Sequence, residues 1–311
     1  MKDIFIHVGY PKTGTTFLQQ KVFENLKVTK SFGKPKIEEN MKFIINSICK
    51  DDKITFESNK ELLLEKLKFI QFKEKNIISL EEFTSCMDVN NYNLIQIQDR
   101  LFNIFNNLSK KNFRIKIILV LRNQKDIVLS YYTECYEKII KVNSRWTNFK
   151  NFLNKFKNND EKNLIIDSFN YNLLIRQIYK YYPKQNVKIL FYEDFKSNIR
   201  NFMNDLLIFI DDNLDNNYEL KNYKVHHSFK DKNQNYRKLK KNYLISFLSD
   251  KIITNLFIKN FFYKIYYFLK TTDKVKLNID QQKMIINYFK DDNACLEKEI
   301  GIKLKKDYFE I

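Results

Sequence analysis

The chain has 311 residues, of which 44% are hydrophobic and 15% aromatic, and this composition supports a packed core and excludes a disordered chain. The formal net charge of +18 favours anionic partners such as nucleic acid, anionic lipid, acidic glycans or a nucleotide, without choosing among them. This length is within the range of one α/β domain with elaborations, so we predict a single domain over residues 1–311.

The cysteine pattern gives no support for a metal site. The four cysteines lie far apart, and the sequence has neither a CxxC nor an HExxH motif. The N-terminus runs straight into an apolar segment without signal-peptide architecture, and no uncharged apolar run reaches the ~18 residues of a spanning helix. We therefore expect a cytoplasmic protein that binds no metal.

The chain opens with an apolar strand over residues 4–8, a tight turn, and a helix that begins near Phe17. The free N–H groups of such a turn and the positive end of the helix dipole form an anion site. Only four glycines occur in the chain, and two of them, Gly9 and Gly14, bracket this turn. We therefore predict a phosphate-binding loop here; the alternative is a solvated turn whose polar residues only cap a helix.

The side chains of this turn make it a variant phosphate loop. Nucleotide-kinase loops have the pattern GxxxxGK[ST], with lysine directly after the second glycine. Here Thr15 takes that position, and the turn's lysine, Lys12, comes earlier. The hydroxyl donors of the turn are Thr13, Thr15 and Thr16. The position of the lysine therefore weakens the interpretation of this turn as a nucleoside-triphosphate site.

Two further strands end in polar residues. A short buried strand near residues 77–80 is followed by the acidic pair Glu81 and Glu82. In an open parallel sheet, ligands bind outside the carboxyl ends of strands, which places Glu81 at a site. The alternative is an exposed helix start whose acids are favoured by the helix dipole.

Residues 115–121 form the clearest strand, with the continuous β-branched pattern of a buried parallel strand. This strand runs into Arg122, and a helix carries Ser130 eight residues later and Glu134 one turn beyond that on the same face. The alternatives are a strand-end surface charge for Arg122 and an ordinary helix position for Ser130. One interpretation of Glu134 places it near the acceptor, and a plain surface role is favoured over it.

These segments resemble the sulfotransferases, and in particular bacterial carbohydrate sulfotransferases. Residues 10–16, with the sequence YPKTGTT, look like the family's 5′-phosphosulfate loop. The strand that ends at Arg122, followed by Ser130, is similar to its 3′-phosphate site. Ser79 and Glu81 match its segment of serine, any residue and glutamate. Residues 292–297 and 301–304 resemble its C-terminal signature. A further buried strand is predicted over residues 187–192, and residues 192–194 match a strand end that supports the sheet in the family.

The resemblance implies a sulfuryl donor, 3′-phosphoadenosine 5′-phosphosulfate (PAPS), a product, 3′,5′-bisphosphoadenosine (PAP), and no metal. It implies that Arg122 and Ser130 hold the 3′-phosphate, that Lys12 stabilises the leaving phosphate, and that Glu81 is the general base. The backbone that would hold the 5′-phosphosulfate is that of Lys12, Thr13, Gly14, Thr15 and Thr16. The chain departs from some relatives in having no glycine between Gly33 and Gly301, so it lacks their glycine-rich loop over the adenine.

The expected fold is an α/β, P-loop-like three-layer fold, with a central, mostly parallel sheet flanked by helices and helical elaborations toward the C-terminus. A loop is expected over Ser31–Pro35, and a helical hairpin over residues 243–269. The alternative for residues 243–269 is a basic, aromatic surface that binds peripherally to the inner face of the membrane.

The expected acceptor is a hydroxyl or amine of a glycan or glycolipid, on the basis of the family resemblance and the positive charge. Two other classes of function stay open: a P-loop kinase of nucleotides or small molecules, and a nucleic-acid-binding protein that uses its charge. We expect no specific nucleic-acid partner. Nothing in the sequence indicates the oligomeric state.

Overall fold

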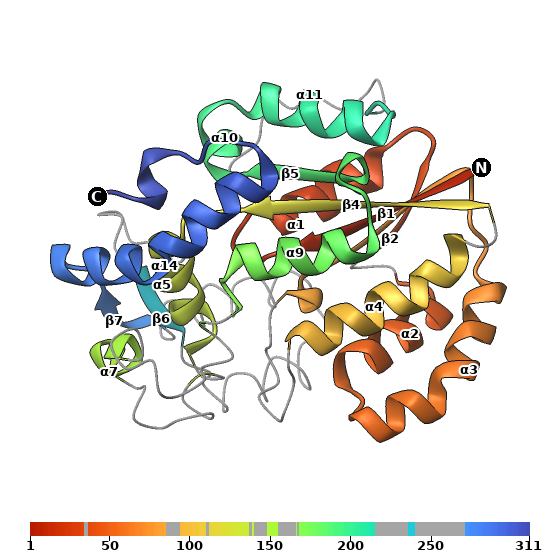
Figure 1. Ribbon diagram of the computed structural model, residues 1–311, viewed down its shortest axis with the longest axis horizontal. Helices are drawn as coiled ribbons and strands as arrows, with labels where there is room; N and C mark the ends of the chain where they lie inside the picture. The colour runs from red at the N-terminus through yellow and green to blue at the C-terminus, as the bar shows by residue number, and fades with distance from the viewer. Residues whose placement is uncertain are drawn as a thin grey trace, which may run out of the picture.

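The computed structural model describes residues 1–33, 37–84, 94–109, 112–136, 139, 148–154, 166, 168–214, 236–239 and 271–311. A five-stranded, entirely parallel sheet lies at its centre, in the order β2-β3-β1-β4-β5 (Figure 1). The strands are β1 (Lys2–Gly9), β2 (Thr29–Gly33), β3 (Lys75–Leu80), β4 (Phe113–Leu121) and β5 (Val187–Phe191). The predicted α/β fold with a parallel central sheet is confirmed.

Helices cover both faces of the sheet, because alternate side chains of each strand are buried on opposite sides. In β1, Ile4, Ile6 and Val8 belong to one apolar cluster and Phe5 to the other. The first cluster packs under α2 (Glu39–Lys50), α3 (Lys53–Phe69), α4 (Leu94–Ser109), α5 (Gln124–Glu134), α9 (Tyr171–Tyr181) and α14 (Ile279–Ile300). The second packs under α1 (Thr15–Phe17) with η1 (Leu18–Val22) and η2 (Phe23–Asn25), α10 (Tyr192–Ser197) and α11 (Ile199–Ile210) (Figure 1).

Within the loop expected over Ser31–Pro35, residues 31–33 instead belong to the edge strand β2, and residues 34 and 35 lie outside the described residues. Residues Thr29–Gly33 pair in parallel with β3, and Phe32 is buried against the first cluster. Asp212, which follows α11, holds the start of the strand, since its Oδ2 accepts from Thr29 N (2.9 Å) and Thr29 Oγ1 (2.6 Å). A partner that is distant in the sequence therefore fixes a segment whose local composition favours a turn.

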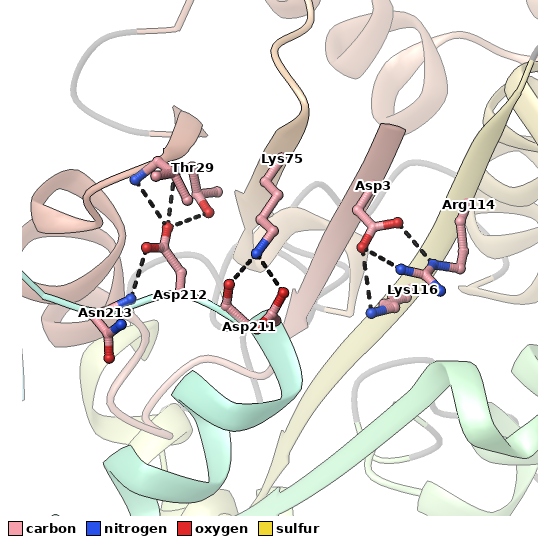
Figure 2. A network of polar contacts seen from close by, with 9 residues as sticks. Asp3, Thr29, Lys75, Arg114, Lys116, Asp211, Asp212 and Asn213 are labelled. Atoms are coloured by element: carbon pink, nitrogen blue, oxygen red, sulfur yellow. Dashed lines mark hydrogen bonds and ion pairs between the residues drawn. The ribbon is translucent and has the colours of Figure 1, made fainter. Parts of the chain in front are cut away.

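The amino edge of the sheet is fixed by ion pairs (Figure 2). Asp3 at the start of β1 is buried and pairs with Arg114 at 2.8 Å and with Lys116 at 3.4 Å. Burial by itself would raise the pKa of Asp3, but the hydrogen bonds and charges of Arg114 and Lys116 outweigh burial and lower it. Lys75 pairs in the same way with Asp211 at 2.8 Å. The ion pairs at this edge stabilise the fold. The candidate site lies at the opposite, carboxyl edge.

Several local boundaries differ from expectation. The helix expected from Phe17 begins at Thr15 and continues as the π-helical η1 and the 3₁₀-helical η2. A small antiparallel sheet of β6 (Tyr236–Leu239) and β7 (Thr271–Val275) was not expected. The remaining elements are η3 (Glu81–Phe83), α7 (Phe149–Leu153), η6 (Lys184–Asn186) and η8 (Lys306–Tyr308).

The hairpin or membrane face expected over residues 243–269 lies outside the described residues. Among the helices that the structure describes, none combines the length and the apolar character required to cross a bilayer.

Candidate active site

The strand register brings the predicted site segments to one edge of the sheet. Val8 of β1 lies opposite Leu80 of β3, and Gly9 lies opposite Val120 of β4. The residues that follow these strand ends are therefore neighbours in space: the loop over residues 10–16, Glu81 and Arg122. The carboxyl edge of a parallel sheet is the usual location of ligand sites in such folds.

The loop is held by its own backbone conformation and hydroxyls. Lys12 (φ 68°) and Gly14 (φ 85°) have left-handed backbone conformations, so the chain reverses tightly between them. The hydroxyls of Thr13 and Thr15 donate to the Tyr10 carbonyl at 2.6 and 3.0 Å. These two hydroxyls therefore point into the loop and shape it, while the Thr16 side chain is exposed.

A buried histidine supports the loop from below. A side-chain carbon added at Gly9 would lie only 2.8 Å from His7 Cε1, so glycine is required where the loop crosses His7. His7 Nδ1 lies 2.7 Å from Ser79 Oγ, and Gln19 Nε2 donates to Ser79 O at 3.0 Å. This cluster fixes the backbone two residues before Glu81. Sequence reasoning missed His7, although a polar residue within an apolar strand was a usable signal.

The histidine cluster predicts a pH-dependent stability. Burial lowers the pKa of His7 to about 3, whereas an unfolded histidine titrates near 6.5. Between these values the unfolded chain binds the extra proton, so stability falls as the pH falls, by about 1.4 kcal/mol per pH unit from this group. Urea unfolding of the wild type and His7→Asn from about pH 7 to about pH 5 measures the difference.

The asparagine of His7→Asn retains a nitrogen near Ser79 without titrating in this range, and all other groups are common to both proteins. We expect the free energy of unfolding of the wild type to fall more steeply with decreasing pH than that of His7→Asn. Parallel curves would show that His7 is charged in the folded protein or plays no part.

Arg122 joins the two halves of the predicted site. Its Nη1 donates to the Lys12 carbonyl at 2.9 Å, and the guanidinium lies over the Tyr192 ring at 4.7 Å. The Arg122 side chain is almost fully buried, and its Nη2 lies 3.7 Å from Asp126 Oδ2. A loop near the N-terminus and an arginine 110 positions later thus belong to one site.

Helix α5 contributes the polar residues beside these cations. Ser130 is buried, and its Oγ has no hydrogen-bond partner among the described residues. Leaving a hydroxyl buried without a partner costs free energy, so this position suits a ligand oxygen. At the end of the same helix, Glu134 Oε2 lies 2.8 Å from Lys12 Nζ. Glu134 is exposed, as a surface role predicts, and it is in addition an ion-pair partner of the loop lysine.

Buried amide side chains and the half-buried Glu193 hold the start of α5. Asn123 caps the helix and donates from its backbone N and its Nδ2 to Glu193 Oε1, at 3.0 and 2.9 Å. Gln124 and Asn293 exchange two side-chain hydrogen bonds, of 2.7 and 3.1 Å. Tyr171 donates its hydroxyl to the Arg122 carbonyl at 2.6 Å. The residues after β5 and the C-terminal segment therefore position Arg122 and α5, in agreement with the structural role predicted for residues 192–194.

No group of three or more histidine, cysteine, aspartate or glutamate side chains within the described ranges is arranged to hold a metal ion. The placed side chains instead combine two cations, the Ser130 hydroxyl and loop amides. This set of donors is suited to oxyanions. Glu81 stands at the end of β3, and Thr84 ties its segment to β1 by donating to Gly9 O at 2.6 Å.

Comparison with known proteins places the chain in a family. The sulfotransferase domain family matches residues 1–260. A sulfotransferase from Alicyclobacillus acidocaldarius is similar in structure, with a TM-score of 0.52 and 13% identity over 98% of this chain and 97% of that one. The sulfotransferase domain of the Synechococcus PCC 7002 olefin synthase aligns with a TM-score of 0.35 and 13% identity, over 92% and 94% of the two chains.

Mouse sulfotransferase SULT7A1, in a complex with PAP, aligns with a TM-score of 0.31 and 16% identity, over 69% of this chain and 61% of that one. No curated protein matches the sequence. The likeness to the Alicyclobacillus enzyme agrees with the three-layer parallel architecture described above. Because the family match covers most of the chain, the protein belongs to the sulfotransferase domain family and is a sulfotransferase.

Proposed function

We propose that this enzyme transfers a sulfuryl group from PAPS to a hydroxyl or amine of a carbohydrate or glycolipid. The observation that carries the donor assignment is the contact between Arg122 Nη1 and the Lys12 carbonyl. It joins the loop that resembles a 5′-phosphosulfate site to the arginine that resembles a 3′-phosphate site. One nucleotide with phosphates at both ends would span them.

The buried Ser130 hydroxyl supports the same assignment. Its Oγ lacks a partner among the described residues, and a 3′-phosphate oxygen beside Arg122 would supply one. At the other end, the backbone N–H groups of residues 12–16 would hold the 5′-phosphosulfate. The Thr16 hydroxyl is exposed and adds a donor, whereas Thr13 and Thr15 contribute by fixing the loop.

The chemistry follows from where charge develops. PAPS supplies an activated sulfuryl group, and transfer leaves negative charge on the 5′-phosphate. Lys12 places an ammonium at this loop, where it would stabilise that charge as it forms. Glu81, at the neighbouring strand end, would accept the proton of the attacking hydroxyl or amine. Arg122 and Ser130 bind and orient the nucleotide and take no part in proton transfer.

The acceptor class rests on the resemblance to carbohydrate sulfotransferases and on the net charge of +18, which favours anionic glycans or an anionic membrane surface. We place the enzyme in the cytoplasm, with peripheral contact to the membrane if the acceptor is a glycolipid. Mass spectrometry of glycans from the source cell, with and without the gene, would identify the acceptor by a sulfate-sized mass difference.

Nucleotide-dependent melting tests the donor assignment. PAP should raise the melting temperature of the purified protein far more than ATP with magnesium does, because a ligand that binds the folded state stabilises it by an amount that grows with the ratio of its concentration to its Kd. A larger shift with ATP and magnesium would favour the P-loop kinase. Steeply salt-dependent binding of RNA or DNA, without a response to PAP, would favour the nucleic-acid-binding alternative.

A further inference from the structure

Glu134 forms an ion pair with Lys12, the lysine that binds the donor in the proposed function. The distance between Lys12 Nζ and Glu134 Oε2 is 2.8 Å, within the range of a charge-assisted hydrogen bond. The lysine side chain is 18% exposed and the glutamate 39%, so water only partly screens the pair. A carboxylate oxygen thus lies where a phosphate oxygen held by Lys12 would lie.

The position of Glu134 in its helix is not explained by helix stability. It is the last residue of α5, and a negative charge at the C-terminal end of a helix is disfavoured by the helix dipole. The start of this helix is fixed by the cap at Asn123 and its bonds to Glu193. With the helix held in this way, its end presents an acid to Lys12 at a local cost.

Donor binding must change this arrangement. A phosphate at Lys12 would bring up to about two negative charges beside the Glu134 carboxylate, and like charges so close repel each other. The lysine then exchanges the carboxylate for the phosphate, or the two anions share one cation at a cost. In both cases the affinity for the 5′-phosphate end is reduced by the interaction that Glu134 makes in the donor-free protein.

We propose that Glu134 is the resting counter-ion of Lys12, and that donor binding displaces it, so that Glu134 sets the donor affinity. This inference rests on the proposed function, since it requires a 5′-phosphate at Lys12. It makes Glu134 a positioning residue for Lys12 in the donor-free state. In this proposal the Glu134 carboxylate competes with the donor's 5′-phosphate for Lys12.

The test measures PAP binding by isothermal titration calorimetry to the wild type and Glu134→Gln. Removing the ion pair should tighten PAP binding by about fivefold, which corresponds to the upper range of partly exposed ion pairs. The matched control is Asp205→Asn. Asp205 on α11 forms an ion pair of 3.3 Å with Lys188 on β5, and this variant removes the same negative charge as Glu134→Gln does. This control should leave the affinity for PAP unchanged.

A second ligand distinguishes the local effect of Glu134 on Lys12 from a general effect of the negative charge on nucleotide binding. Adenosine 3′-monophosphate has the 3′-phosphate but nothing for Lys12 to hold, so Glu134→Gln should not alter its binding. Tighter binding of PAP alone supports the proposal. Unchanged or weaker PAP binding, or equal tightening of both ligands, overturns it. If the wild type itself does not bind PAP, the proposed function fails, and that result is distinct from a failure of the Glu134 inference.

Discussion

Replacing Lys12 by alanine should lower kcat/KM by about 10³-fold, the upper range for loss of one preorganised charge at a transition state. The fold should remain, because the side chain is partly exposed and its ion pair with Glu134 contributes at most about 1 kcal/mol. The carbonyl that Arg122 binds belongs to the backbone and is still present. Initial rates of PAP formation, measured together with thermal melting, separate loss of chemistry from loss of structure.

The matched control is Lys188→Ala, which removes one positive charge and one ion pair, with Asp205, away from the loop. It should retain near-normal turnover. A Lys12→Ala enzyme that keeps more than about a tenth of wild-type activity would remove Lys12 from the role of transition-state stabiliser. Equal losses in both variants would indicate a general effect of charge.

Four of the five strands of the sheet were predictable because they are short runs of mainly apolar residues. The segments near residues 4–8, 77–80, 115–121 and 187–192 all became parallel strands. The fifth, Thr29–Gly33, was not predictable because a glycine and a nearby proline dominate its local pattern. Its position depends on Asp212, 183 residues away from Thr29, and on backbone pairing with β3. Such long-range contacts leave no local periodicity.

The candidate site shows the same division. Lys12 and Arg122 could be proposed from motif and order, since each follows an apolar strand and the carboxyl ends of parallel strands meet at one edge. The contact between Arg122 and the Lys12 carbonyl, and the pair between Lys12 and Glu134, depend on side-chain geometry over more than a hundred positions. The spacing that places Glu134 on the face of Ser130 gave its location but not its partner.

Glu81→Gln should reduce kcat by about 10²-fold or more, the usual contribution of a general base, while PAP binding stays close to wild type. The amide retains the shape of the carboxylate but cannot accept the proton of the acceptor hydroxyl. Ser79 and Thr84, which hold the backbone around this position, are untouched, so folding should be preserved. Single-turnover rates with saturating donor measure the chemical step separately from binding.

Two variants decide whether Glu81 is the group responsible. Glu82→Gln removes the same charge from the adjacent residue and should leave kcat unchanged. Glu134→Gln tests the carboxylate that pairs with Lys12: in the proposed mechanism its principal effect is on donor affinity, because the lysine holds it in the resting state. Near-normal turnover in Glu81→Gln would remove Glu81 from the mechanism. A large loss of kcat in Glu134→Gln, with Glu81→Gln active, would transfer the general base to α5, since Glu134 pairs with the lysine that the proposed mechanism assigns to the donor.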